Sequence, residues 1–304
     1  MTILDLLKAE RPTLKESSLK AYMSSLRKLN KYLENDNSIP TALSFLMKTD
    51  RINTFLDDLK TDNTRKAYMN HIIVFLLLLN KITPSIEITA FIDVLRKRVD
   101  LLNKQYVDFA KTNEKTEKQE KNWMTVDEIK LVANTLKRTD FQAYACIMIH
   151  LHIPMRNDLP TIMKITKKRY DNLPDERKNN TNAIVEIAPR VFEFRLNDYK
   201  TNQVYKETVI PIPTELTPVI VKLIKFNSMT DNLITNPKTG DQMSKNEYTR
   251  YLNNLFQHTG KKISSCILRN IVLSEKYGET IKDMKVDANN MMHSTDMQRS
   301  YIKC

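Results

Sequence analysis

Five residues whose types suit phosphodiester chemistry occur in the second half of the sequence. In chain order they are Arg156, Lys200, Arg269, His293 and Tyr301. Attack on a phosphodiester builds negative charge around phosphorus, and the planar fork of an arginine matches two phosphate oxygens. Preorganised donors of this kind are usually the largest catalytic contribution. Two arginines from different segments can therefore clamp both non-bridging oxygens of one phosphate.

The lysine, the histidine and the tyrosine can supply the other parts of a strand-cutting reaction. A lysine can protonate the leaving sugar oxygen as a general acid, and a histidine can donate a further hydrogen bond or assist proton transfer. A tyrosine offers a phenolic oxygen that can hold a covalent phosphoryl intermediate. Because this link conserves the phosphodiester energy, strands can be rejoined without ATP. The set therefore implies neither a metal nor a nucleotide cofactor.

Each of these residues also has an ordinary structural interpretation. Arg156 can simply pair with Asp158, and Lys200 in a turn can simply be solvated. Arg269 is more unusual, because it lies on an apolar helix and arginine is rarely buried without a partner. Five residues of suitable types in one order favour the catalytic interpretation. Of the other histidines nearby, His152 is expected in the core.

The segments that carry these residues resemble the tyrosine recombinase (phage integrase) family. The likeness covers most of the chain and is strongest from about residue 145 onward. The family's two arginines match Arg156 and Arg269, and its late histidine and its nucleophile match His293 and Tyr301. Its β-hairpin lysine matches Lys200, in the segment FEFRLNDYKTNQVYKETVIPIP. The segments PMRNDL and YKT are most similar to recombinases of eukaryotic mobile elements and large DNA viruses.

The sequence departs from the family's pattern in four respects. The family usually has a histidine three positions before the second arginine, where this sequence has Cys266, and a thiol is a weak donor. The acidic residue after the first arginine is Asp158, two positions on instead of three. His293 precedes Tyr301 by eight positions, one fewer than the commonest pattern. Only three residues follow Tyr301, where many members carry a helix that docks on a neighbouring subunit. Cys266 and Asp158 are therefore candidate accessory residues.

The resemblance implies a site-specific DNA recombinase or integrase. Tyr301 would attack a DNA phosphate and give a 3′-phosphotyrosyl link and a free 5′-hydroxyl. The implied partner is double-stranded DNA, and a tetramer of protomers on two DNA sites is expected. Two alternatives stay open. One is a type IB topoisomerase or telomere resolvase-like enzyme with the same chemistry, and the other is an inactive DNA-binding relative in which Cys266 marks the loss of activity.

Composition agrees with a polyanionic partner. The 304 residues include 48 Lys and Arg against 36 Asp and Glu, which gives a formal net charge of +12. Such an excess favours nucleic acid, although a well-solvated basic enzyme is the alternative. The three cysteines are odd in number and far apart, which is typical of free thiols in an intracellular, non-secreted protein. The host nucleus or cytoplasm is expected if the source is viral. No apolar run reaches the roughly 20 residues of a membrane span, so no membrane partner is expected.

Residues 1–110 are expected to form a helical DNA-binding (core-binding) domain. Apolar residues recur at helical spacing, Thr61 stands at a capping position, and the segment IIVFLLLLNKI at 72–82 is expected to be a core helix. The expected helices are 2–9, 14–34, 40–47, 50–59, 62–82 and 86–110. In the family this domain clamps DNA, and a solvated helix face is the alternative for each basic residue on its outer faces. The candidate phosphate contacts are Lys20, Arg27, Lys28, Arg65 and Lys66.

Residues 111–122 are expected to be a charged linker, because the segment KTNEKTEKQEKN has no apolar stripe. Residues 123–304 are then expected to form the catalytic domain, which opens with a capping box from Thr125 to Glu128. Strands are expected over 183–196 and 204–212, on either side of Lys200. Helices are expected at 124–136, 140–152, 214–227, 244–259, 264–277 and 280–292. The sequence thus predicts a mainly α fold with a small β-sheet, in which a helical domain precedes a mixed α/β catalytic domain of tyrosine recombinase type.

Overall fold

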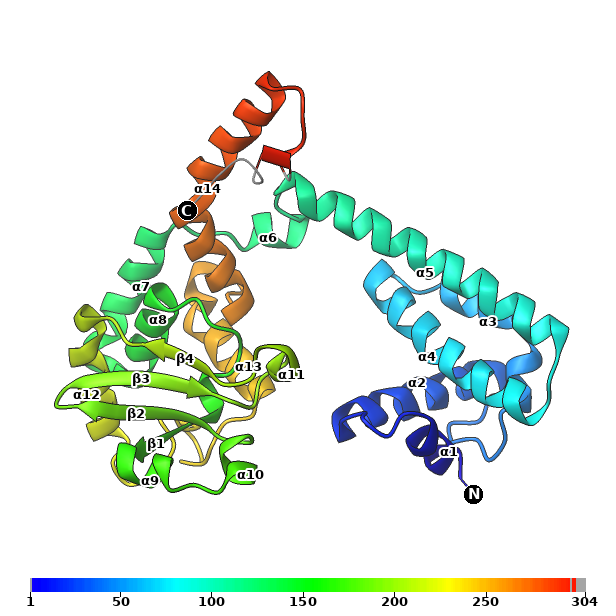
Figure 1. Cartoon of the computed structure of the whole chain (residues 1–304), viewed down its shortest axis with the longest axis horizontal. Coiled ribbons are helices and arrows are strands. Elements are labelled where there is room, and N and C mark those ends of the chain that lie inside the picture. The colour runs from blue at the N-terminus through cyan, green and yellow to red at the C-terminus, as the bar shows by residue number, and fades with distance from the viewer. Residues whose placement is uncertain (1, 296, 299–304) are drawn as a thin grey trace. The chain divides into compact units, whose positions relative to one another are not determined.

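The computed structural model describes residues 2–295, 297 and 298. Its elements form two compact units, residues 1–114 and 115–304 (Figure 1). Each unit buries its own cluster of apolar side chains, as independent folding of each requires.

The first unit is all helical. Its elements are α1 (Ile3–Glu10), α2 (Glu16–Glu34), the 3-10 turn η1 (Ser44–Met47), α3 (Thr49–Asp57), α4 (Asp62–Ile82) and α5 (Ile86–Thr112). These agree with the expected helices, except that 40–47 contributes only the short turn η1. The Thr61 side chain accepts the Thr64 backbone N–H and caps α4 as predicted.

Helix α4 forms the centre of the first core. Its apolar run is buried on most sides, and Ile72, Phe75 and Leu76 are each at most 2% exposed. The prediction of a core helix at this segment is therefore confirmed. Among the described residues, no helix combines the length and apolarity needed to cross a membrane.

The charged segment 111–122 carries helical structure. Helix α5 continues to Thr112 and ends at Asn113, whose φ of 58° is left-handed. Helix α6 (Glu117–Lys121) follows, with Thr116 in a capping box. Helix α6 belongs to the second unit, and its C-terminal end is bound within that unit, because Lys261 Nζ donates to the Lys121 carbonyl at 3.0 Å. The high charge of the segment predicts exposure, and local capping is what gives it helical turns.

The second unit combines helices with one small sheet. The main helices are α7 (Val126–Thr139), α8 (Phe141–His152), α12 (Thr217–Phe226), α13 (Lys245–Leu255) and α14 (Ser265–Asn290). The strands are β1 (Ile162–Thr166), β2 (Asn182–Ala188), β3 (Val191–Leu196) and β4 (Thr208–Pro211), in the order β1-β2-β3-β4. Shorter helical pieces are η2 (Leu159–Thr161), α9 (Lys167–Asp171), α10 (Asp175–Lys178) and α11 (Asn202–Tyr205). The predicted mainly α fold with a small β-sheet is confirmed, as is the Thr125 capping box of α7.

The sheet differs in detail from the prediction. The expected strand 183–196 is two antiparallel strands, because the chain reverses at Arg190, whose φ is 61°. Within 204–212, only Thr208–Pro211 is a strand, and the first two residues belong to α11, which ends at Tyr205. Strand β1 was not expected, and it pairs in parallel with β2 so that Ile162 stands opposite Asn182. This register places the start of β1 next to the first residue of β2.

Helix α14 is a single element where two helices were expected. The sequence predicts a break between residues 277 and 280, but the helix passes through this segment, which includes Gly278, without interruption. A mid-helix glycine costs roughly 1 kcal/mol relative to alanine, which weakens a helix without ending it. The N-terminal part of α14 packs into the core through Ile267, Leu268 and Ile271. Between Ile271 and Ala288 no side chain of α14 is buried.

Candidate active site

Arg156 lies in the loop that follows α8. Pro154 lacks a backbone N–H and cannot continue the helix, so the chain leaves the core just before this arginine. Arg156 is exposed, and within the described part of the chain its guanidinium makes no ion pair or hydrogen bond. Its alternative partner, Asp158, is 6% exposed and instead accepts from Lys245 Nζ at 2.6 Å. The Arg156 fork is therefore open to an anion from outside.

Arg269 lies in the second turn of α14. Its side chain is half-buried, and Nη2 stands 3.9 Å from the sulfur of Cys266, one turn earlier on the same helix. Sulfur is a weak acceptor and this distance is long, so the contact restrains the guanidinium little. Cys266 is exposed at the start of α14.

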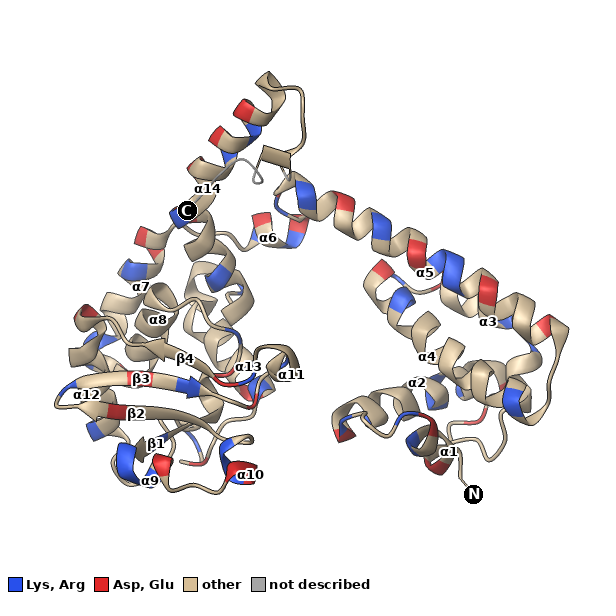
Figure 2. Ribbon diagram, in the orientation of Figure 1, with Lys and Arg blue, Asp and Glu red and all other residues tan. Residues whose placement is uncertain are grey.

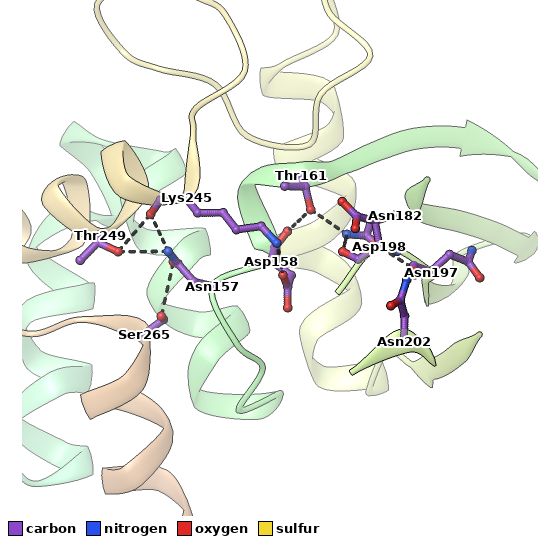
Figure 3. A network of polar contacts seen from close by, with 10 residues as sticks. All are labelled: Asn157, Asp158, Thr161, Asn182, Asn197, Asp198, Asn202, Lys245, Thr249 and Ser265. Atoms are coloured by element: carbon purple, nitrogen blue, oxygen red, sulfur yellow. Dashed lines mark hydrogen bonds and ion pairs between the residues drawn. The ribbon is translucent and has the colours of Figure 1, made fainter. Parts of the chain in front are cut away.

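Asn157 ties the segments of the two arginines together (Figure 3). Its Nδ2 donates to the Lys245 carbonyl and to Thr249 Oγ1 at 3.0 Å, both on α13. Its Oδ1 accepts from Ser265 Oγ at 3.4 Å. The residue next to Arg156 is thus bound to the first residue of the helix that carries Arg269. One half-buried amide joins the α8–η2 loop, α13 and α14.

Lys200 is exposed in the connection between β3 and β4. The start of this connection is bound to Asn182, which accepts the backbone N–H groups of Asn197 and Asp198 at 2.9 Å each. Asn182 also donates to Thr161 Oγ1 at 2.7 Å, at the entrance to β1. The polar network in Figure 3 therefore runs from α14, through the Arg156 loop, to the segment before Lys200. Sequence reasoning missed its members Asn157, Asn182 and Lys245, because asparagine and lysine at such positions look like ordinary turn and surface residues.

His293 is held by the turn that ends α14. Met292 has a φ of 54°, and its N–H donates to the Asn289 carbonyl at 3.0 Å. The His293 N–H donates to the Ala288 carbonyl at 3.0 Å. This paired pattern is the Schellman motif, which satisfies the last carbonyls of a helix.

The described structure does not bring His293 beside the arginines. The helical residues between Arg269 and Asn290 span about 30 Å at 1.5 Å per residue. In Figure 1 the C-terminal part of α14 projects beyond the sheet of its unit. The expected nucleophile, Tyr301, lies outside the described residues.

A buried histidine marks the neighbourhood of Arg269. His150 on α8 is fully buried, and its Nε2 lies 3.0 Å from the hydroxyl of Tyr248 on α13. Burial, together with the positive charge of Arg269, lowers the pKa of His150 to about 4, so its ring is neutral at pH 7. The sequence predicts His152 in the core instead. That prediction is wrong, because His152 lies half-buried with Nδ1 3.9 Å from Glu215, and His150 occupies the core.

The basic candidates of the first unit divide into two groups. Lys20, Arg27 and Lys28 are exposed on α2 and make no ion pair within the described residues. Arg65 is occupied, because it donates to the Leu56 and Leu59 carbonyls at 3.0 Å each and pairs with Asp62. Figure 2 shows that basic residues are spread over both units and alternate with acidic ones along α5.

Lys66 lines a groove in the first unit. Its Nζ donates to Asn103 Oδ1 at 2.8 Å. The groove has a volume of about 540 Å³ and combines two cationic side chains with amides and rings. Its polar and aromatic lining residues are Arg11, Tyr22, Asn63, Lys66, Asn70 and His71. Of these, only Lys66 was a candidate from the sequence.

Neither protein-family models nor curated proteins give a match to this chain. Among solved structures, the Tn1549 transposon integrase in complex with circular intermediate DNA superimposes with a TM-score of 0.54. That match has 14% sequence identity and covers 100% of this chain and 96% of the other. A lambda integrase tetramer bound to a Holliday junction gives a TM-score of 0.52 at 11% identity, over 88% of this chain and 70% of the other. The chain therefore has the fold of the tyrosine recombinases, with a helical unit followed by a mainly helical unit that holds a small sheet.

Proposed function

We propose that the protein is a site-specific DNA recombinase or integrase that breaks and rejoins DNA through a 3′-phosphotyrosyl intermediate. The observation that carries the proposal is the hydrogen-bonded joining of three segments by Asn157 and Asn182 (Figure 3). These segments carry Arg156, Lys200 and Arg269, which sequence order alone leaves far apart. The likeness of the fold to DNA-bound integrases and the net charge of +12 support the same function.

In the proposed reaction each residue acts at a separate atom of the phosphodiester. Arg156 and Arg269 bind the non-bridging oxygens and stabilise the charge that develops there. The phenolic oxygen of Tyr301 releases its proton to solvent water and forms a bond to phosphorus, while the bond from phosphorus to the 5′-oxygen breaks. Lys200 gives its proton to that leaving oxygen. Rejoining is the reverse reaction, in which a 5′-hydroxyl attacks the phosphotyrosyl link and Tyr301 leaves. His293 donates a further hydrogen bond to the phosphate or assists proton transfer.

If one protomer supplies both Arg269 and His293 to a phosphate, α14 must change shape. The two residues stand at opposite ends of one helix, so within one protomer they meet only if the helix breaks between them. The part after Ile271 buries no side chain before Ala288, so a break there sacrifices little packing. Gly278 lies within that part, and glycine is the residue at which a helix is weakest.

Gly278→Ala is therefore expected to stabilise the protein and slow DNA cleavage. An added Cβ meets no atom within 4 Å, so the substitution introduces no clash. Alanine strengthens the continuous helix by about 1 kcal/mol, which lowers the population of the broken form about fivefold. Single-turnover cleavage and the unfolding temperature measure the two effects. Gly278→Ser should give an intermediate rate, and a more stable Gly278→Ala protein with an unchanged rate would argue against the required break.

The implied partner is double-stranded DNA, bound by a tetramer of protomers on two sites. The segments PMRNDL and YKT favour an origin in eukaryotic mobile elements or large DNA viruses, with action in the host nucleus or cytoplasm. A type IB topoisomerase would share the chemistry but would need only one protomer on one duplex. A catalytically inactive relative, in which Cys266 indicates the loss of activity, would bind DNA without cutting it.

A nicked suicide substrate tests the proposal. When cleavage occurs next to a nick, a short DNA fragment diffuses away and the protein stays covalently attached. The proposal expects a protease-sensitive adduct, and it expects a joined product when two duplexes carrying the site are supplied. DNA binding with no adduct would support the inactive relative. An adduct with relaxation of supercoils but no joined product would support the topoisomerase.

Lys200→Ala is expected to be slow on normal DNA and largely rescued on DNA with a 5′-bridging sulfur. A thiolate leaves without help from a general acid, so only the step that needs the Lys200 proton is bypassed. Loss of the general acid should cost of order 10²-fold or more on normal DNA. Arg156→Ala should show no rescue, because its role is at the non-bridging oxygens. Equal Lys200→Ala defects on both substrates would make Lys200 a binding residue.

A further inference from the structure

Asn182 is a buried amide whose hydrogen-bonding capacity is fully used. The residue is 2% exposed, at the first position of β2. Its two N–H groups donate to Thr161 Oγ1 at 2.7 Å and to the Asp198 carbonyl at 2.9 Å. Its Oδ1 accepts the N–H groups of Asn197 and Asp198. Two donors and two acceptor positions are all that an asparagine side chain offers, so no bond is left for solvent.

Three of these four bonds hold the backbone immediately before Lys200. Asn197 and Asp198 directly follow β3, and Lys200 comes two residues after Asp198. Next along the chain, Tyr199 is 9% exposed, and its hydroxyl donates to the Lys206 carbonyl at 2.7 Å on the far side of the turn. Lys200 therefore projects from a turn whose base is fixed while its own side chain is exposed.

The turn is also closed by a second asparagine. Asn202 Nδ2 donates to the Asn197 carbonyl at 2.7 Å, from just after Lys200 back to the residue that Asn182 binds. Asn197 in turn donates from Nδ2 to the Tyr170 hydroxyl at 2.8 Å. Hydrogen bonds made by asparagine side chains thus hold both ends of the short segment 197–202.

The fourth bond of Asn182 leads to the Arg156 loop. Thr161 Oγ1, which accepts from Asn182, donates to the Asp158 carbonyl at 2.7 Å. The parallel register of β1 and β2 places these two residues together, because Ile162 stands opposite Asn182. The hydrogen bonds of Asn182 therefore link the backbone before Lys200 to the segment that carries Arg156 (Figure 3).

We infer that Asn182 is a positioning residue for Lys200, which it aims at the leaving 5′-oxygen of the phosphate that Arg156 holds. The inference rests on the proposed function. Proton transfer needs the donor within hydrogen-bond reach, and a misplacement of about 1 Å can cost 10²-fold in rate. A buried asparagine with a purely structural role would stabilise the strand ends but would have no specific relation to the leaving group.

The test compares Asn182→Asp and Lys200→Ala on normal DNA and on 5′-bridging phosphorothiolate DNA. The aspartate keeps the size of the side chain but replaces the N–H groups that bind Thr161 and the Asp198 carbonyl. We expect Asn182→Asp to cleave normal DNA of order 10-fold to 10²-fold more slowly than the unmodified protein. On the sulfur substrate its cleavage rate should be within about threefold of the rate of the unmodified protein. The thiolate leaves without a proton from Lys200, so the position of that lysine no longer limits the rate.

Asn157→Asp is the matched control. It makes the same chemical change in the same network, but on the side that joins Arg156 to α13 and α14. Because the arginines act on both substrates alike, its defect should persist on the sulfur substrate. Rescue of Asn182→Asp without rescue of Asn157→Asp is the result that supports the inference.

The outcomes separate the inference from the proposed function. If Lys200→Ala is not rescued, the general-acid role of Lys200 fails. If Lys200→Ala is rescued and a folded Asn182→Asp is equally slow on both substrates, or as fast as the unmodified protein on normal DNA, the positioning role of Asn182 is overturned. If Asn182→Asp does not fold, Asn202→Ala decides. That variant removes one half-exposed bond to Asn197, and slowing on normal DNA with rescue by sulfur supports the inference while any other pattern overturns it.

Discussion

Tyr301→Phe is expected to abolish covalent capture of DNA and leave DNA binding intact. The substitution removes only the phenolic oxygen, which is the atom proposed to bond to phosphorus. Binding rests on phosphate contacts spread over basic residues, and one phenol adds little to it. A gel-shift titration measures binding, and denaturing electrophoresis of a suicide-substrate reaction measures the adduct.

Tyr277→Phe is the matched control for this result. Tyr277 is 45% exposed on α14 and is the nearest tyrosine before Tyr301 in the sequence. Its loss should leave the adduct at the level of the unmodified protein. A Tyr301→Phe protein that still forms a protease-sensitive adduct would show that another residue is the nucleophile, and peptide mapping of the adduct would locate it.

Much of the fold could be predicted because its signals are local. The helices of the first unit follow from apolar spacing, and the Thr61 and Thr125 caps follow from residues three apart. Strand β1 could not be predicted in this way. It depends on parallel pairing with β2, which places Ile162 opposite Asn182 across a long crossover. The break expected between residues 277 and 280 is absent, because the continuous helix tolerates the cost of Gly278.

The same difference between local and long-range signals applies to the candidate site. Residue types and their order point to Arg156, Lys200 and Arg269, and local chemistry accounts for them. The parts that hold these residues are long-range contacts between unremarkable side chains. Asp158 was weighed as the partner of Arg156, but the charge nearest to it is Lys245, a residue 87 positions away. Asn182 carries no sequence signal for its role, since only the fold brings Thr161 and Asp198 to it.

Arg156→Lys and Arg269→Lys are each expected to reduce cleavage by of order 10²-fold or more, which corresponds to about 2.7 kcal/mol of transition-state stabilisation. Lysine keeps the positive charge but replaces the two-pronged fork with a point charge. Arg156 has no partner among the described residues that the change would disturb, so its effect should fall on the chemical step and not on folding. Single-turnover cleavage at saturating DNA measures the loss, and thermal unfolding checks the fold.

The double variant tests whether both arginines hold one phosphate. Groups that act on the same transition state are strongly coupled, so the double variant should lose less than the product of the two single losses. Losses that simply multiply would place the arginines at separate phosphates. Arg138→Lys is the control, because Arg138 is exposed in the last turn of α7, and its cleavage rate should not change. Near-normal cleavage by both single variants would mean that neither arginine touches the scissile phosphate, and the clamp would have to be sought among the other basic residues of the second unit.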